Sequence, residues 1–128
     1  MRVLVTGHKG YIGTTLVPLL QSEGFDVTGL DSDLFRECTF DKGMVNIPEV
    51  IKDVRDVTAR DVEGHDAIIH LAGLSNDPLG DYDPTLTDDI NCQGSIKLAR
   101  IAKQVGVRRF VFASSCSNYG AAGDQFLT

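Results

Sequence analysis

The stretch that decides the fold of this chain is Val3-Leu4-Val5-Thr6-Gly7-His8-Lys9-Gly10-Tyr11-Ile12-Gly13. Apolar residues that favour a buried strand run directly into three glycines, placed at every third position. Apolar residues then recur at helical spacing over residues 16–20. A strand, a glycine turn and a helix start form a socket for a pyrophosphate, because glycine permits the tight turn and the close approach of the backbone. The anion then lies on free amide groups at the positive end of the helix.

An acidic residue after the next strand supports a dinucleotide ligand. The short run Val27-Thr28-Gly29-Leu30 ends at Asp31, roughly 20 residues after the glycine turn, where a carboxylate can bind the hydroxyl pair of a ribose. A nucleoside-triphosphate loop is excluded, because it needs Gly-Lys-Ser/Thr at its end and Gly13 is followed by Thr14-Thr15. A methyltransferase stays open in principle, although its glycine loop usually follows an acidic strand end and Thr6 stands there.

Composition narrows the class of protein. The chain has 128 residues, of which 42% are hydrophobic and 23% charged, as in one soluble globular domain. A net charge of −6 argues against a nucleic-acid partner, and no apolar run has the length of a membrane span. The chain enters a strand directly after Met1, so we expect no leading signal segment. Three cysteines without paired spacing favour a reducing cytoplasm over disulfides or a zinc site.

Apolar periodicity places alternating strands and helices along the chain. We predict strands near residues 2–6, 26–31, 49–53, 66–72 and 109–114 and helices near 11–23, 58–63 and 84–104. This alternation predicts an α/β fold with a doubly wound parallel sheet in the strand order 3-2-1-4-5. The segment 32–48 is expected to be an irregular connection beside the ligand.

Other polar residues are expected to be structural. His70 lies in an apolar strand end and is predicted to be a buried, hydrogen-bonded core residue. His8 and Lys9, in the glycine turn, are expected to face solvent near the phosphates. An acidic run over residues 77–89 matches no calcium loop, so we predict a solvated face and no metal site. Cys116 is expected to be a small packing thiol.

Six motifs now stand in order along the chain: Thr6-Gly7-x-x-Gly10-x-x-Gly13, Asp31, Asp53-Val54-Arg55-Asp56, His70-Leu71-Ala72-Gly73, Asn91-x-x-Gly94-Ser95 and Ser114-Ser115-x-x-x-Tyr119-Gly120. Together they resemble the extended short-chain dehydrogenase/reductase family, in its branch of NAD-dependent sugar-nucleotide epimerases and dehydratases. The opening residues are similar to those of UDP-galactose 4-epimerases. The resemblance covers nearly the whole chain and implies that residues 1–128 form one NAD-binding domain of the Rossmann type.

The resemblance also implies which residues bind NAD: Gly7, Gly10, Tyr11, Ile12 and Gly13 at the pyrophosphate, Asp31 at the adenosine ribose, Asp53 and Val54 at the adenine, Leu71, Ala72 and Gly73 along the nicotinamide ribose, and Asn91 holding nearby backbone. The charge of Asp31 would repel the extra phosphate of NADP. Arg36 leaves NADP open, because a guanidinium could pair with that phosphate.

Ser115 is the catalytic residue that the resemblance implies, since it precedes Tyr119-Gly120 by the family's interval and would hydrogen-bond the reacting sugar hydroxyl. The alternative is a purely structural role, in which Ser115 caps the end of a strand. No Tyr-x-x-x-Lys pair follows Ser115, although the family's proton transfer depends on one. We therefore expect an N-terminal part of a longer enzyme, inactive alone, which lacks the last strands and the C-terminal substrate domain. A complete, non-catalytic NAD-binding sensor is the other possibility.

The reaction itself is narrowed by the residues after Ser115. Dehydratases of the family carry Asp-Glu there, whereas this chain has Cys116-Ser117, so a dehydratase is disfavoured. An epimerase or a 4-keto-sugar reductase is left, and Asp31 favours the epimerase because a tightly held NAD recycles its own hydride. The resemblance implies a nucleotide-sugar substrate, a homodimer of the full-length enzyme and a cytoplasmic location.

Overall fold

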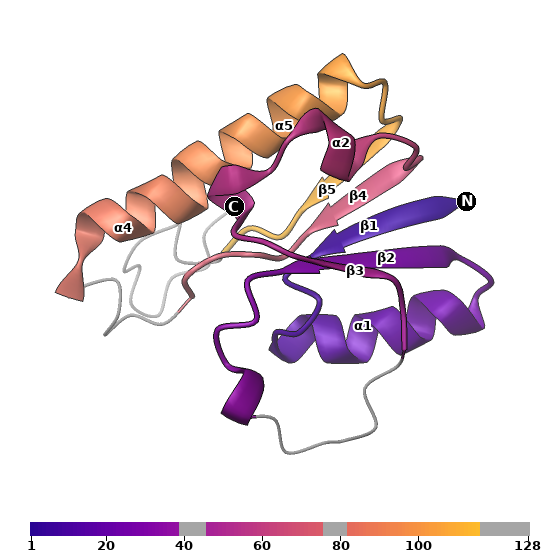
Figure 1. The fold of residues 1–128 in the computed structure, drawn as a ribbon, viewed down its shortest axis with the longest axis horizontal. Coiled ribbons are helices and arrows are strands. Elements are labelled where there is room, and N and C mark those ends of the chain that lie inside the picture. The colour runs from indigo at the N-terminus through magenta and orange to yellow at the C-terminus, as the bar shows by residue number, and fades with distance from the viewer. Residues whose placement is uncertain (39–45, 76–81, 116–128) are drawn as a thin grey trace, which may run out of the picture.

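The computed structural model describes residues 1–38, 46–75 and 82–115 of the chain. Its strands form one parallel sheet in the order β3-β2-β1-β4-β5 (Figure 1). The strands are β1 (Arg2–Thr6), β2 (Asp26–Asp31), β3 (Glu49–Ile51), β4 (Ala67–His70) and β5 (Arg109–Phe112). The predicted α/β fold and its strand order are confirmed.

Helices cover both faces of the sheet, as a buried parallel sheet requires. Figure 1 shows α1 on one face and α2, α4 and α5 on the other. Their bounds are α1 (Tyr11–Ser22), α2 (Ala59–Val62), α4 (Pro84–Asp88) and α5 (Ser95–Gln104), with 3-10 turns η1 (Arg36–Cys38) and η2 (Val54–Asp56). Among the helices of the described ranges, none is long and apolar enough to cross a membrane.

The helix predicted over residues 84–104 is not one continuous α-helix. A π-helical turn, η3 (Asp89–Gly94), separates α4 from α5. Gly94 lies inside this turn, and a Cβ there would stand 3.1 Å from the Val54 side chain. The wide turn therefore lies directly against η2, at the edge of the sheet where the strands end.

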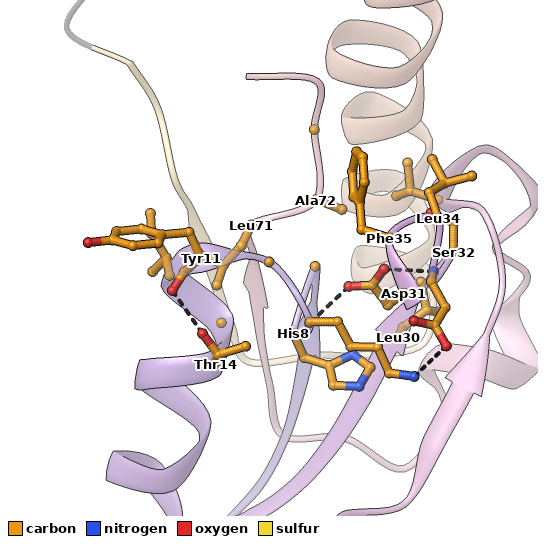
Figure 2. Close-up of a pocket in the computed structure, with 18 of the residues that line it drawn as sticks. His8, Tyr11, Thr14, Leu30, Asp31, Ser32, Leu34, Phe35, Leu71 and Ala72 are labelled. Carbon is orange, nitrogen blue, oxygen red and sulfur yellow. Dashed lines mark hydrogen bonds and ion pairs between the residues drawn. The ribbon is translucent and has the colours of Figure 1, made fainter. Parts of the chain in front are cut away.

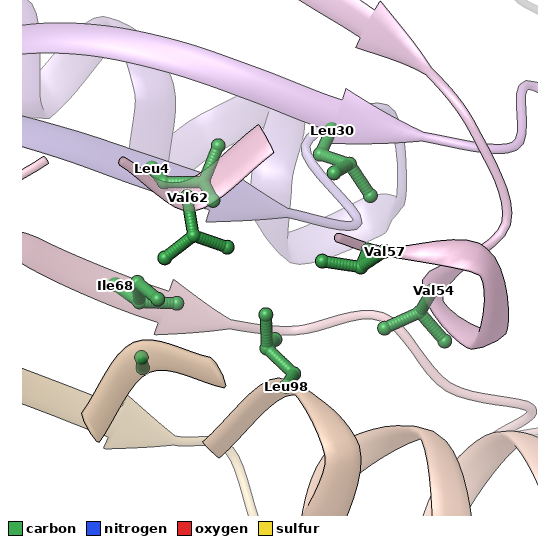
Figure 3. Close-up of a cluster of buried hydrophobic side chains, with 8 residues drawn as sticks. Leu4, Leu30, Val54, Val57, Val62, Ile68 and Leu98 are labelled. Atoms are coloured by element: carbon green, nitrogen blue, oxygen red, sulfur yellow. The ribbon is translucent and has the colours of Figure 1, made fainter. Parts of the chain in front are cut away.

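The side chains of β1 contribute to two hydrophobic cores, because successive side chains of a strand point to opposite faces of the sheet. Leu4 belongs to the core beneath α2 and α5, whereas Val3 and Val5 belong to the core beneath α1. The first core, seen in Figure 3, contains Leu4, Leu30, Val54, Val57, Val62, Ile68, Leu98 and Ala102. The two cores thus pack helices against both faces of the sheet.

Candidate functional site

The carboxyl ends of the strands border a cavity of about 930 Å³. Its wall is built from the glycine turn 7–13, the loop 30–35, residues 52–54, the segment 71–75 and residues 113–114. Figure 2 shows part of this wall, with residues of the glycine turn, the loop 30–35 and the segment 71–75 labelled. This volume is typical of sites that enclose a cofactor. Most residues predicted to bind NAD line this wall, namely Gly7, Gly10, Tyr11, Ile12, Gly13, Asp31, Asp53, Val54, Leu71, Ala72 and Gly73.

Two glycines of the turn are fixed by close packing. Gly7 has φ +73°, and a Cβ there would stand 2.7 Å from the backbone nitrogen of Ala72. A Cβ at Gly13 would stand 2.5 Å from the carbonyl oxygens of Gly7 and His8. Any larger residue would therefore push the turn away from β4 or from α1.

The start of α1 is left open for an anion. Gly10 stands at the N-cap and supplies no side-chain cap, and the first turn of the helix contains no acidic residue. Backbone amides at such a helix end carry partial positive charge. Tyr11 and Ile12 line the cavity from this first turn, so the positive end of the helix borders the cavity.

Asp31 is held in place by two backbone amides. Its Oδ2 accepts a hydrogen bond of 2.9 Å from the Lys9 amide, and its Oδ1 accepts one of 2.9 Å from the Asp33 amide (Figure 2). Asp33 adopts φ 55°, a left-handed conformation that an aspartate tolerates. The carboxylate predicted to bind the ribose is thus fixed between the glycine turn and the loop that follows β2.

The prediction that His8 and Lys9 face solvent is wrong. His8 is only 4% exposed, and its Nε2 lies 3.0 Å from Glu49 Oε2. Lys9 Nζ lies 2.8 Å from Asp33 Oδ2 and 3.0 Å from the same Glu49 oxygen. The hydrogen bond from Lys9 lowers the pKa of Glu49. Burial disfavours the charged form of Lys9, but the bonds to Asp33 and Glu49 outweigh it and raise its pKa.

Gly29 explains why His8 is buried. A Cβ at Gly29 would stand 2.5 Å from the imidazole ring, so the ring occupies the space that a side chain on β2 would fill. A glycine inside a strand often marks such a close approach. This was the signal in the sequence that could have predicted the buried position of His8.

Asp53 and Val54 do not end the third strand, which stops at Ile51 and not at residue 53 as predicted. Asp53 instead caps η2, where its carboxylate accepts hydrogen bonds from the Arg55 amide and guanidinium at 2.8–3.0 Å. These bonds from Arg55 lower the pKa of Asp53. Capping turns the chain out of the strand and places both residues on the cavity wall.

Asn91 does not line the cavity, but its side chain binds the backbone of the wall segment 71–75. Its Oδ1 accepts a hydrogen bond of 2.7 Å from the Leu74 amide, and its Nδ2 donates one of 2.8 Å to the Leu74 carbonyl. A Cβ at Gly73 would stand 3.0 Å from the same Oδ1. The small residue at position 73 therefore lets the amide of Asn91 reach the backbone of the segment 71–75.

His70 is a buried, hydrogen-bonded residue, as predicted. It is 1% exposed, with Nδ1 2.6 Å from Thr6 Oγ1 and Nε2 2.8 Å from Ser95 Oγ. Burial lowers the pKa of His70 to about 4, so its ring is neutral at physiological pH.

The two serines after β5 are placed differently. Ser114 lines the cavity, whereas Ser115 is an exposed residue just beyond it. Cys116 and Tyr119, the next residues of the motif, lie outside the described residues. The role of Ser115 towards a sugar stays a prediction.

Of the acidic run over residues 77–89, the structure describes residues 82–89. Asp83 caps α4 by accepting a hydrogen bond of 3.0 Å from the Leu86 amide. Asp77 and Asp81 lie outside the described ranges. Within those ranges, no three His, Cys, Asp or Glu residues come together as a possible metal site.

Comparison with known proteins agrees with this geometry. Residues 3–127 match the model of the NAD dependent epimerase/dehydratase family. The UDP-glucose 4-epimerase of Bos taurus is 31% identical over 93% of this chain and 38% of its own length. The Thermus thermophilus UDP-glucose 4-epimerase, solved in complex with NAD, superposes with a TM-score of 0.76 at 32% identity, over 90% of this chain and 38% of its own.

A third relative carries out a different reaction. The structure of an NAD-dependent NDP-hexosamine 5,6-dehydratase of tunicamycin biosynthesis superposes with a TM-score of 0.86 at 30% identity, over 100% of this chain and 41% of its own. The chain thus spans about two fifths of the length of these three proteins. Since the family model covers nearly all of its residues, the chain belongs to the NAD-dependent epimerase/dehydratase family.

Proposed function

We propose that the cavity binds NAD and that this chain is the cofactor-binding half of a sugar-nucleotide epimerase. The observation that carries the proposal is the pairing of an uncapped helix N-terminus with a fixed carboxylate across one cavity. The helix end supplies amides for a pyrophosphate, and Asp31 supplies acceptors for the two hydroxyls of a ribose. The NAD complex of the Thermus thermophilus relative supports the same cofactor.

Each part of the wall would have its own task towards NAD. Gly7 and Gly13 keep the turn against β4 and α1, which lets backbone amides approach the phosphates. Asp31 would select NAD, because its charge repels a 2′-phosphate. Asn91 holds the wall at Leu74, next to Leu71, Ala72 and Gly73, along which the nicotinamide ribose would lie. NAD, when bound, would take up a hydride from a sugar carbon, here proposed as C4, and return it.

Ser115 is proposed to hydrogen-bond the reacting sugar hydroxyl. It follows β5 at the carboxyl edge of the sheet, as does Ser114 on the cavity wall. A serine there would orient the hydroxyl and stabilise the proton in transfer. A tyrosinate elsewhere in the enzyme would take the proton, and a neighbouring lysine would lower the pKa of that tyrosine.

A dehydratase is the second candidate, because the 5,6-dehydratase structure superposes over the whole chain. Against it stand Cys116 and Ser117, which replace the acidic residues expected directly after the catalytic serine. A 4-keto-sugar reductase and a non-catalytic NAD-binding module are the remaining alternatives.

The chain itself offers a test of the proposed function. The chain should bind NAD. When saturated with NAD, it should convert no UDP-, dTDP- or GDP-sugar, and the absorbance of reduced nicotinamide measures any conversion. Reduction of NAD by this chain alone would contradict the need for a further tyrosine and lysine. In a longer protein that carries this chain, product analysis should give a 4-epimer, and an unsaturated or deoxygenated sugar would favour the dehydratase.

A further inference from the structure

A continuous series of hydrogen bonds crosses the molecule behind the cavity wall. It begins at the Ala72 amide, which donates to Thr6 Oγ1 at 3.3 Å. Thr6 Oγ1 lies 2.6 Å from His70 Nδ1, and His70 Nε2 lies 2.8 Å from Ser95 Oγ. Ser95 Oγ donates to the Asn91 carbonyl at 2.6 Å. The series therefore links β1, β4 and α5 to the π-helical turn η3.

The direction of every bond in this series follows from its two ends. The Asn91 carbonyl can only accept, so it takes the single hydroxyl proton of Ser95. Ser95 Oγ must then accept from His70 Nε2, which fixes the proton of the neutral ring on Nε2. His70 Nδ1 is left as an acceptor and takes the hydroxyl proton of Thr6. All three side chains are satisfied by this one arrangement.

The series ends on the residue that grips the cavity wall. Asn91 binds the amide and the carbonyl of Leu74 through its side chain, and accepts from Ser95 through its own carbonyl. At the other end, the Ala72 amide belongs to the same wall segment. The wall is thus held at two points by one network that passes through the His70 ring.

We propose that His70 is a positioning residue, held as its Nε2–H tautomer, which fixes the segment 71–74 of the cavity wall to η3 through Thr6 and Ser95. The consequence for NAD binding rests on the proposed function, whereas the tautomer and the anchoring of the wall do not. His70 touches no reacting group, so its effect on a bound cofactor passes through the wall alone.

The tautomer can be read directly by NMR. Long-range proton–nitrogen correlations of the uniformly labelled chain at pH 7 should show the proton of His70 on Nε2. Its signals are identified by their loss in His70→Gln and are separated in this way from those of His8 and His65. A proton on Nδ1, or rapid averaging between the two nitrogens, would overturn the proposal.

The anchoring can be tested with a matched pair of variants. Ser95→Ala removes the hydroxyl, and alanine is well accommodated in a helix. Ser95→Thr keeps a hydroxyl that can still donate to the Asn91 carbonyl. Hydrogen exchange of the Leu74 amide should quicken at least tenfold in Ser95→Ala and stay close to the original rate in Ser95→Thr. The Asp26 amide, which donates to the Met1 carbonyl at the amino ends of β2 and β1, should be unaffected in both. Equal acceleration of both amides, or none at Leu74, would contradict the proposal.

A second pair of variants breaks the network at its other end. Thr6→Val keeps the shape of the buried side chain but removes the hydroxyl, and Thr6→Ser keeps the hydroxyl. Thr6→Val should quicken exchange of the Leu74 amide and weaken NAD binding severalfold, and Thr6→Ser should do neither. If the original chain fails to bind NAD, the proposed function fails, while the exchange rates and the tautomer still decide the present proposal.

Discussion

Acidification from pH 7.5 to pH 5 should destabilise this fold through one residue. His70 is 1% exposed, and burial lowers its pKa from 6.5 to about 4 in the folded chain. Between these two pKa values the unfolded chain binds a proton that the folded chain does not. The contribution of the neutral His70 to the free energy of unfolding is therefore fully present above pH 6.5 and is lost as the pH falls towards 4. This shift predicts a loss of about 2 kcal/mol between pH 7.5 and pH 5.

Urea unfolding followed by circular dichroism at both pH values measures this loss. Above pH 5, Glu49 and Asp53 contribute little to this loss, because their unfolded pKa values of 4.5 and 3.8 lie below this window and their folded pKa values are lower still. His70→Gln should remove most of the pH dependence, since no ring is left to protonate. His65→Gln serves as the matched control and should retain it. A free energy of unfolding that is the same at both pH values, or an unchanged slope in His70→Gln, would refute the reasoning.

Two further predictions concern the glycine turn and the serine pair. Gly7→Ala should destabilise the chain by more than Gly24→Ala in urea unfolding. Both positions have positive φ, which costs an alanine about 1–2 kcal/mol. Only at Gly7 would the added Cβ also meet backbone, 2.7 Å away. In a longer, active protein, Ser115→Ala should lower turnover about 10²-fold and leave NAD affinity unchanged. Ser114→Ala should cost far less, and equal or reversed effects in a steady-state assay would count against Ser115.

The sheet could be predicted because its signals are local. Continuous apolar runs followed by glycines or acids mark the ends of parallel strands, and the alternation with helical periods leaves few possible topologies. The glycine turn was also visible, because a positive φ at Gly7 and close packing at Gly13 each require that residue type. The same local logic placed Asp31 on the wall of the cavity.

The features that were missed depend on contacts between distant segments. His8 is buried because Gly29, on another strand, leaves room for its ring. Lys9 is held by Asp33 and Glu49, which meet it only after the sheet has formed. No window of sequence contains both partners of these contacts.

The most direct test of the central claim is calorimetric titration of the chain with NAD and with NADP. NAD should bind at least tenfold more tightly, a difference of about 1.4 kcal/mol, because the fixed carboxylate of Asp31 repels the 2′-phosphate. Asp31→Ala should narrow this difference. An absence of NAD binding, or NADP binding that is equal or tighter, would contradict the account.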